Sequence, residues 1–439
     1  MHDISFESPS RILPLVAGGA RQAAGPSAPF MPAVQRPAAV MCRGQGSYLW
    51  DEAGHRYLDV VQGWATNALG HSPPELLTAL AEQSSLLINP SPAYYNRPAI
   101  ELVRLLATVT GAAQVALLNS GAEANETAIK LARKWGRKYK GGAFGILSTL
   151  NAFHGRTLAA MAVSGKPGWD ELFPPYPPGF RKVPYGDLAA MESAIDPRCV
   201  ALMVEPIQGE AGVVLPPRGY LKGLRELADR HELLLILDEV QTGLGRTGTF
   251  LAAEQEGVRA DITTLGKGLG AGLPVSAVLC NERAACFEPG DIGSTHGGNP
   301  LLAQVGLAMC RIMSDAEFLA GVRRRGFALE SALRQLAQAW GDVSWRGCGL
   351  LQALVLEQPI APALADAARE HGLLINAARP NVLRLMPQLR ISGSEISELC
   401  ARLARVWTAV VMSNQFGTVA NSAANSAANS AAASAQPGG

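Results

Sequence analysis

An aspartate and a lysine in this 439-residue chain are the side chains whose type and setting point most directly to chemistry. Asp238 ends the apolar run 233–237, and Lys267 stands between Gly266 and Gly268 after a second, shorter strand signal that breaks at Gly266. An unbroken apolar run that stops at a charge is typical of a buried parallel strand, and open α/β sheets bind ligands beyond the carboxyl ends of such strands. We therefore expect Asp238 and Lys267 to face one pocket.

A nucleophilic lysine together with a buried carboxylate suits the chemistry of one cofactor. A lysine amine forms a Schiff base with pyridoxal phosphate, and an acid that pairs with the pyridinium nitrogen keeps the ring protonated, so that the ring can accept electrons. Each side chain also has a plainer interpretation, because an aspartate after a strand commonly caps a loop and a lysine is commonly exposed. The glycines beside Lys267 favour a close approach of the backbone to a ligand.

Two glycine-rich stretches suggest nucleotide binding instead, and their context argues against it. Residues 243–248 (GLGRTG) fit the GxGxxG pattern of dinucleotide folds, but polar residues separate them from the preceding strand and no clear helix begins at the last glycine. Around Lys267 the P-loop pattern fails, because Gly268 stands where a serine or threonine is required. A nicotinamide-dependent oxidoreductase remains the alternative from a different class.

Strand and helix signals alternate between residues 65 and 300, which predicts an α/β fold with a doubly wound, mostly parallel sheet. The later part changes to long helices, a strand pair and a final amphipathic helix, which predicts a smaller α+β domain. The strand signals are VALLNS, FGILST, CVALMVEP, LLLILDE, ITTLG and VSAVLC. We expect a flexible N-terminal arm at 1–35, a hairpin segment packed on the small domain at 36–64, a large cofactor-binding domain at 65–300, the small domain at 301–412 and a disordered low-complexity tail at 413–439.

Composition narrows the class of partner. The formal net charge is +1 with 17% charged residues, so there is no basic field for nucleic acid or an anionic membrane, and we expect a small-molecule partner. The seven cysteines form no CxxC pair or Cys/His cluster, so we expect neither a disulfide framework nor a metal site. No apolar run approaches a membrane span of about 20 residues, and no signal peptide is evident, so we expect a cytoplasmic protein.

Several longer motifs follow one another in order along most of the chain. They are YLWDEAGHRYLD, ALGHSPPEL, NSGAEANETAIKLARKW, FHGRTLAAMAVSGK, VEPIQGEAGV, LDEVQTGLGRTG, LGKGLGAGLP and GSTHGGNPL. On these motifs the sequence resembles, over roughly residues 32–411, the class III aminotransferases of the fold type I pyridoxal phosphate enzymes, and within them the acetylornithine aminotransferases. The resemblance implies a pyridoxal phosphate-dependent transaminase.

A helix N-terminus after the strand signal VALLN is a candidate phosphate site. The first backbone N–H groups of a helix lack partners within the helix, and together with the helix dipole they bind a phosphate without a basic residue. A plain capped helix is the alternative. The resemblance assigns the cofactor phosphate to Ser120, Gly121 and Ala122.

The resemblance also assigns the groups around the cofactor ring. Phe153 corresponds to a phenylalanine that stacks on one face of the ring, and Val240 to a valine that packs on the other. Gln241 corresponds to a glutamine that binds the phenolic oxygen. Asp238 then meets the ring nitrogen, and Lys267 binds the aldehyde. By residue type alone, a phenylalanine after a strand is more often part of the core.

Two arginines offer the planar forks that bind carboxylates in a bidentate manner. The resemblance implies that Arg156 holds a substrate carboxylate and that Arg384 holds the α-carboxylate of glutamate and 2-oxoglutarate. It also implies that Glu210 pairs with Arg384 when no α-carboxylate is present. Thr295 corresponds to a threonine that binds the cofactor phosphate of the partner subunit, and we assign its neighbour Ser294 to substrate binding. A homodimer with composite active sites is the consequence.

Three further polar residues near the motifs have less specific interpretations. Glu205 closes a strand at the same predicted edge, and we interpret it as a support of the hydrogen-bond network. Glu239 is expected to point away from the site. We interpret His154 as structural or solvent-facing, because no second histidine or cysteine lies at metal spacing.

The resulting hypothesis is a transfer of the ω-amino group of N-acetylornithine to 2-oxoglutarate, which gives N-acetylglutamate 5-semialdehyde and glutamate. The alternatives within the class are ω-aminotransferases that act on ornithine, succinylornithine or 4-aminobutyrate. A homologue without activity is the remaining alternative, and Lys267 and the two arginines argue against it.

Overall fold

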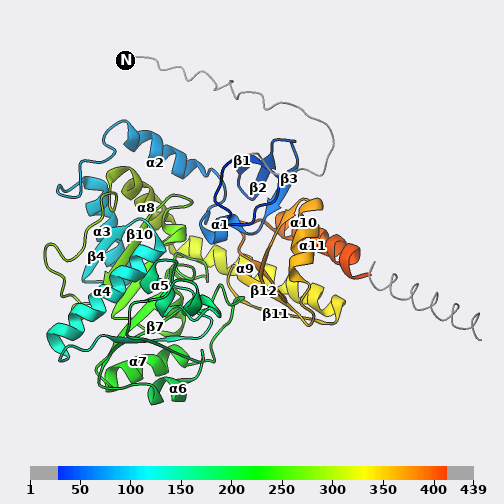
Figure 1. The fold of residues 1–439 in the computed structure, drawn as a ribbon. Helices are drawn as coiled ribbons and strands as arrows, with labels where there is room; N and C mark the ends of the chain where they lie inside the picture. The colour runs from blue at the N-terminus through cyan, green and yellow to red at the C-terminus, as the bar shows by residue number, and fades with distance from the viewer. Residues whose placement is uncertain (1–27, 413–439) are drawn as a thin grey trace, which may run out of the picture.

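The computed structural model describes residues 28–412, and these residues form three β-sheets (Figure 1). The central sheet is parallel except for one strand, β10, which runs antiparallel to both of its neighbours. Its strand order is β4 (Gln114–Leu118), β10 (Ser276–Cys280), β9 (Ile262–Leu265), β8 (Leu234–Asp238), β7 (Cys199–Val204), β5 (Gly145–Thr149) and β6 (Phe180–Val183). The predicted α/β fold with a doubly wound, mostly parallel sheet is confirmed.

The edge strand β6 was not among the predicted strands. Its sequence is FRKV, so charged side chains interrupt the apolar run that marks the other strands. An edge strand tolerates such residues because one of its sides is open to solvent, and Lys182 there forms an ion pair with Asp170 at 2.7 Å.

Helices cover both faces of the central sheet, as the alternation of side chains along β8 shows. Leu234 and Ile236 pack in one apolar cluster with α4 (Gly121–Tyr139), whereas Leu235 and Leu237 pack in another with α7 (Tyr220–Arg230). Every residue of β8 is buried, which explains the unbroken apolar run. The shorter helices α5 (Leu158–Val163) and α6 (Leu188–Ser193) complete these layers.

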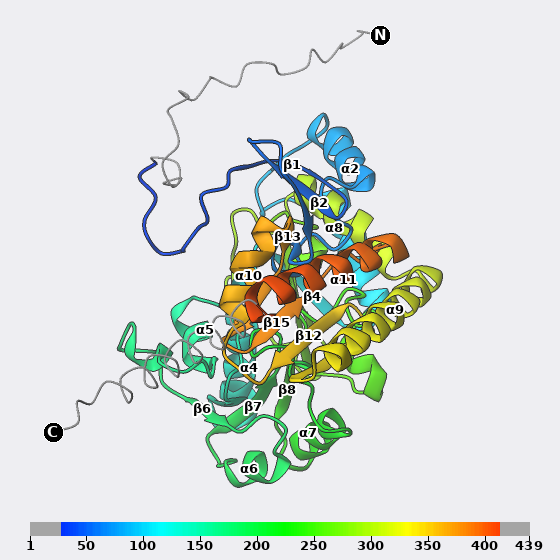
Figure 2. The same ribbon diagram turned by 90° about the vertical axis from the view of Figure 1, so that its right-hand side faces the viewer.

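The two smaller sheets lie to one side of the central sheet (Figure 1). In the first, the hairpin strand β3 (Arg56–Asp59) pairs in parallel with the late strand β13 (Leu373–Leu374), so segments more than 300 residues apart lie side by side. The helix α9 (Ala316–Trp340) packs against the second, antiparallel sheet and against α11 (Gly393–Trp407) (Figure 2). The ring of Trp340 stacks on that of Trp407, with centroids 4.3 Å apart. The strands are β1 (Met41–Gln45), β2 (Tyr48–Asp51), β3 (Arg56–Asp59) and β13 (Leu373–Leu374), then β11 (Val343–Cys348), β12 (Leu351–Leu356), β15 (Val382–Leu385) and β14 (Asn376–Arg379).

The remaining helices connect these parts. The bounds are α1 (Gln62–Ala65), α2 (Pro74–Ser84), α3 (Arg97–Thr110), α8 (Pro300–Met313), α9 (Ala316–Trp340), α10 (Ala361–Glu370) and α11 (Gly393–Trp407). The division at residues 36, 65, 301 and 413 stays a proposal, and most of the predicted arm and all of the predicted tail lie outside the described residues. Within 28–412, no helix is both long and apolar enough to cross a membrane.

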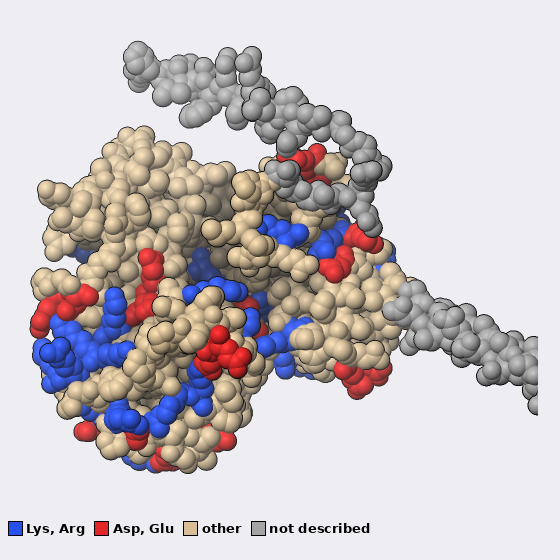
Figure 3. Space-filling model, viewed as in Figure 1, with Lys and Arg blue, Asp and Glu red and all other residues tan. Residues whose placement is uncertain are grey.

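Charged side chains of both signs are interspersed on the face of the molecule in Figure 3, over the part that contains α4, α6 and α7. The upper left of this view, over α2, is almost free of charge.

Candidate active site

The ends of β8 and β9 bring Asp238 and Lys267 to one cavity of about 270 Å³. This is the juxtaposition that the sequence predicted for the carboxyl edge of the sheet. Other residues predicted for the site line the same cavity, namely Gly121, Ala122, Phe153, Arg156, Glu210, Val240 and Gln241.

Asp238 is held as a carboxylate by a set of hydrogen bonds. It is 4% exposed and accepts from His154 Nδ1 and Asn125 Nδ2, both at 2.7 Å, and from the Val240 N–H at 3.0 Å. Burial alone would raise the pKa of Asp238, but the hydrogen bond and charge of His154, with the bonds from Val240 and Asn125, place this pKa below its usual value. The side chain is therefore suited to stabilise positive charge in the cavity.

Two partners of Asp238 were missed or misjudged from the sequence. His154 is 1% exposed and contacts Asp238, so of its two predicted interpretations the solvent-facing one is wrong, and the structural one did not include this contact. Asn125 lies on α4 and bridges Asp238 and the His154 carbonyl oxygen, to which Nδ2 donates at 2.7 Å. The sequence offered one signal for them. Asn125 and His154 stand in the same two motifs that contain the candidate phosphate-binding and ring-contact residues.

Lys267 occupies a tight turn directly after β9. Its φ of 42° lies in the left-handed region, and a Cβ at Gly266 would come within 3.2 Å of Val240 Cγ1, which leaves little room for a side chain there. Burial lowers the pKa of Lys267 from 10.5 to about 8, and the charge of Arg384 acts in the same direction, against Glu210 and Asp238. A larger share of the amine is therefore neutral and nucleophilic near neutral pH.

Ser120 caps the N-terminus of α4 in a capping box. Its Oγ accepts from the Glu123 N–H at 3.2 Å, and Glu123 Oε2 accepts from the Ser120 N–H at 2.8 Å. A Cβ at Gly121 would lie 2.7 Å from Val240 Cγ1, so this first turn approaches the cavity wall closely. The plain capped helix is thus present, and the cap leaves the next N–H groups, of Gly121 and Ala122, beside the cavity.

Glu205 connects two loops of the site. One carboxylate oxygen accepts from the Phe153 N–H at 2.9 Å and the other from the Gly209 N–H at 3.2 Å. Burial raises the pKa of Glu205 to about 7, and the charge of Asp238 adds to this while His154 opposes it. Glu205 therefore fixes the backbone that carries Phe153, as the predicted supporting role requires.

Arg384 on β15 is fully buried and forms an ion pair with Glu210 at 2.7 Å. It also donates to Gln241 Oε1 and Asn376 Oδ1, each at 3.1 Å. Burial alone would raise the pKa of Glu210, but the charges of Arg384 and Lys267 hold this pKa below its usual value. The side chains implied by the resemblance thus meet in the folded chain.

Arg156 reaches the cavity from its exposed rim, where its guanidinium lies 5.5 Å from the centre of the Trp169 ring. Ser294 and Thr295 do not line this cavity in the described part of one chain. Ser294 Oγ accepts from Asn119 Nδ2 at 2.9 Å, and Thr295 is exposed. Their assigned contacts to substrate and to a partner's cofactor stay predictions.

The stretch GLGRTG does not form a dinucleotide-binding loop. Residues 240–247 make consecutive turns, bends follow from residue 248, and no helix begins at Gly248. Arg246 is buried and donates to the Leu350 and Pro387 carbonyl oxygens, so the stretch ties the central sheet to the later part of the chain. Glu239 accepts from Thr242 and from the Ala253 N–H and is not a lining residue of the Lys267 cavity, as predicted.

The donors and acceptors around the cavity fit pyridoxal phosphate. Among the described residues, Gln241 Nε2 and His154 Nε2 are buried without a hydrogen-bond partner, and Gln241 lines the cavity with an amide that can donate to a phenolic oxygen. The carboxylate of Asp238, the amine of Lys267 and the helix N-terminus supply partners for a ring nitrogen, an aldehyde and a phosphate. No group of three potential metal ligands occurs within residues 28–412.

The fold and this cavity define a transaminase of the pyridoxal phosphate-dependent α/β type. Residues 30–407 match the model of the family described as Aminotransferase class-III. The chain belongs to this family, and it is a pyridoxal phosphate-dependent transaminase.

Individual relatives agree with this assignment. The chain is 49% identical over 384 residues to acetylornithine aminotransferase 2 of Bordetella pertussis, covering 87% of this chain and 97% of the relative. It is 44% identical to the ornithine aminotransferase of the same organism, covering 84% and 90%. The solved structure of the ornithine aminotransferase of Toxoplasma gondii, reported with partial occupancy of pyridoxal phosphate, matches with a TM-score of 0.83 at 35% identity, covering 88% and 94%.

Proposed function

We propose that the protein binds pyridoxal phosphate in the Lys267 cavity and transfers the ω-amino group of N-acetylornithine to 2-oxoglutarate. The observation that carries this proposal is the meeting of Lys267 and Asp238 in one cavity beside the Glu210–Arg384 ion pair. The 49% identity to an acetylornithine aminotransferase supports this donor over ornithine, whose enzyme in the same organism is 44% identical.

The protein groups divide the work of holding the cofactor. Asp238 would face the ring nitrogen, Gln241 would donate to the phenolic oxygen, and Phe153 and Val240 would pack on the ring. The N–H groups at the start of α4, next to Ser120, would hold the phosphate. When bound, pyridoxal phosphate supplies an electrophilic aldehyde carbon and a ring that accepts electrons from the reacting carbon.

Lys267 supplies the amine and moves the proton. With a pKa of about 8, its Nζ is partly neutral at neutral pH, so it can attack a carbonyl carbon without prior loss of a proton to another base. As a neutral amine, Nζ could also take a proton from the substrate carbon and deliver it to another atom in the cavity. Asp238 keeps its negative charge and would stabilise a protonated ring nitrogen.

Two arginines and one glutamate adapt the site to two substrates. Arg156 at the rim binds the α-carboxylate of N-acetylornithine, which lies far from the reacting ω-amine, while Glu210 stays paired with Arg384. When 2-oxoglutarate enters, its α-carboxylate replaces Glu210 on Arg384 and its other carboxylate takes Arg156. Ser294, which does not line the cavity of its own chain, is assigned together with Thr295 to the site of the partner chain.

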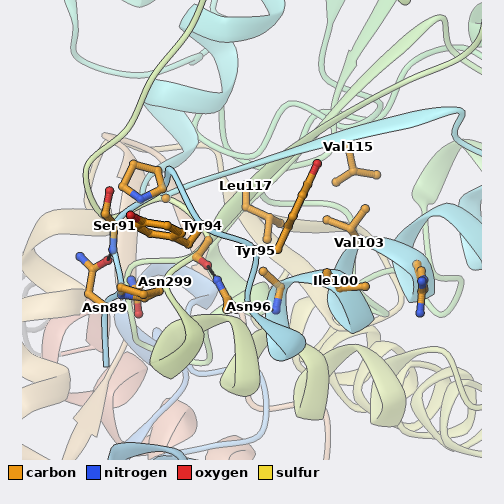
Figure 4. Close-up of a pocket in the computed structure, with 16 residues that line it drawn as sticks. Asn89, Ser91, Tyr94, Tyr95, Asn96, Ile100, Val103, Val115, Leu117 and Asn299 are labelled. Atoms are coloured by element: carbon orange, nitrogen blue, oxygen red, sulfur yellow. Dashed lines mark hydrogen bonds between the residues drawn. The ribbon is translucent and has the colours of Figure 1, made fainter. Parts of the chain in front are cut away.

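We further propose a homodimer in which Thr295 of one chain binds the cofactor phosphate of the other. The segment between α2 and α3 exposes apolar side chains, with Tyr94 69% and Tyr95 95% exposed, beside a hollow of about 480 Å³. Figure 4 shows Tyr95 between Leu117 and Val103 in this hollow, which Gly297 and Gly298, close to Thr295, also line. An apolar patch of this kind is typical of a protein interface.

Donor competition tests the proposed activity. We expect the purified protein to be yellow and to convert N-acetylornithine and 2-oxoglutarate with a higher kcat/KM than ornithine, succinylornithine or 4-aminobutyrate. A preference for one of those three amines would replace the proposed donor. Absence of transfer from all four would contradict the proposal. For the dimer, Tyr95→Glu should sediment at half the mass of the wild-type protein.

A further inference from the structure

Trp169 contacts Phe153 and Arg156, two residues that line the active-site cavity, and three side chains surround its ring. Phe153 meets it edge-on, with centroids 5.6 Å apart, and the Arg156 guanidinium and Lys166 Nζ lie 5.5 and 5.2 Å from its centre. Trp169 is 6% exposed, and the Tyr176 hydroxyl donates to its carbonyl oxygen at 2.7 Å. The ring is thus a fixed platform that carries two cations.

Within residues 28–412, no ion pair within 4 Å joins Arg156 or Lys166 to a carboxylate. Glu210, whose charge acts on Lys166, is engaged by Arg384 at 2.7 Å. Burial and the charge of Arg156 lower the pKa of Lys166, and the charge of Arg379 adds to this, while Glu210 opposes it. Two like charges held together on one ring favour a bound anion.

We propose that Lys166 is a further substrate-binding residue, which with Arg156 forms a two-cation site for the substrate carboxylate farthest from the reacting atoms. This inference rests on the proposed function and extends it, because it assigns the recognition of N-acetylornithine and 2-oxoglutarate to a lysine that does not itself line the cavity. Trp169 is the positioning residue, since its ring sets where both cations stand.

The alternative is that Lys166 only covers the exposed edge of Trp169 with its aliphatic stem. The two roles predict different results. A stem that covers the ring can be replaced by methionine without loss of ligand affinity, whereas a cation that binds a carboxylate can be replaced only by arginine.

Binding of glutarate to the holoenzyme tests this directly, because glutarate carries both carboxylates of 2-oxoglutarate and cannot react. By titration calorimetry, Lys166→Met should raise the Kd for glutarate by about tenfold, since a hydrogen bond to a charged group is lost. Lys166→Arg should stay near the wild-type value. Lys130→Met removes a positive charge from an exposed position on α4 and should leave the Kd unchanged.

An unchanged glutarate Kd in Lys166→Met, or an equal weakening in Lys130→Met, would overturn the proposal. Steady-state kinetics give a second readout: Lys166→Met should raise KM for 2-oxoglutarate and N-acetylornithine with kcat within about twofold, whereas a loosened Trp169 would lower kcat as well. If the wild-type protein transfers no amine from N-acetylornithine, the proposed function fails; if it does and Lys166→Met behaves as wild type, this inference alone fails.

Discussion

Glu210 Oε1 and Arg384 Nη1 lie 2.7 Å apart beside the cavity that contains Lys267. Arg384 is fully buried, and a buried charge that loses its partner costs several kcal/mol. Glu210 can therefore turn away only when another anion takes its place. In the proposed reaction that anion is the α-carboxylate of 2-oxoglutarate or glutamate, so one pair of side chains distinguishes the two half-reactions.

Removing the charge of Glu210 should make Arg384 more available. In Glu210→Gln we expect the apparent KM for 2-oxoglutarate to fall by about tenfold, because the dicarboxylate no longer displaces a charged competitor. Steady-state assays at saturating N-acetylornithine measure this. Glu192→Gln, which alters a surface ion pair with Arg230, is the matched control and should change nothing. A KM that stays constant or rises in Glu210→Gln would refute the competition.

The lowered pKa of Lys267 should be visible in the pH dependence of cofactor uptake. The neutral amine reacts with an aldehyde, so the rate at which cofactor-free protein takes up pyridoxal phosphate should rise with pH and level off above pH 8. A lysine with an ordinary pKa would show a rise that continues beyond pH 10. Stopped-flow absorbance between pH 6.5 and about 10.5 distinguishes the two. A continued rise would mean that the cavity does not favour the neutral amine.

Glu205 should make stability depend on pH in a defined direction. Its folded-state pKa of about 7 lies above the unfolded value of about 4.5, so between these values the folded state binds the proton more tightly and stability falls as pH rises. Glu205→Gln removes this dependence. Relative to wild type, the variant should gain up to about 3 kcal/mol in free energy of unfolding on going from pH 4.5 to pH 8. Urea unfolding at both pH values measures this difference in free energy. A variant that gained stability relative to wild type as the pH fell would contradict the raised pKa of Glu205.

The first turn of α4 should not tolerate a side chain at Gly121. A Cβ there would lie 2.7 Å from Val240 Cγ1, so Gly121→Ala should displace either the helix start or Val240. We expect a loss of about 1–3 kcal/mol in stability and weaker retention of pyridoxal phosphate during dialysis. Gly393→Ala, at an open helix start on α11, is the control and should retain both. Full cofactor retention in Gly121→Ala would show that this turn is not close to the phosphate.

Much of the fold follows from local sequence patterns. The buried strands β7 and β8 carry unbroken apolar runs. Asp238 and Lys267 meet because Asp238 is the last residue of β8 and Lys267 lies two residues after β9, which is the neighbour of β8 in the sheet. The strand β6 escapes this rule since its Arg181 and Lys182 lie at an edge, where solvent and an ion pair replace apolar packing.

Contacts between distant segments were the part that the sequence did not reveal. Asp238, His154 and Asn125 come from three different elements, so no spacing along the chain indicates that they share hydrogen bonds. Arg156 and Lys166, whose charged groups both lie close to the ring of Trp169, are a similar case. Thr295 differs again, because its proposed partner belongs to a second chain.

The central claim is that Lys267 is the residue to which the cofactor aldehyde is bound. Reduction of the holoenzyme with borohydride, followed by proteolysis and mass spectrometry, tests it most directly. We predict that the phosphopyridoxyl group is found on the peptide that contains Lys267, at that side chain, and that Lys267→Ala lacks both the modification and transaminase activity. Attachment to another lysine, or no attachment in an active preparation, would contradict the claim.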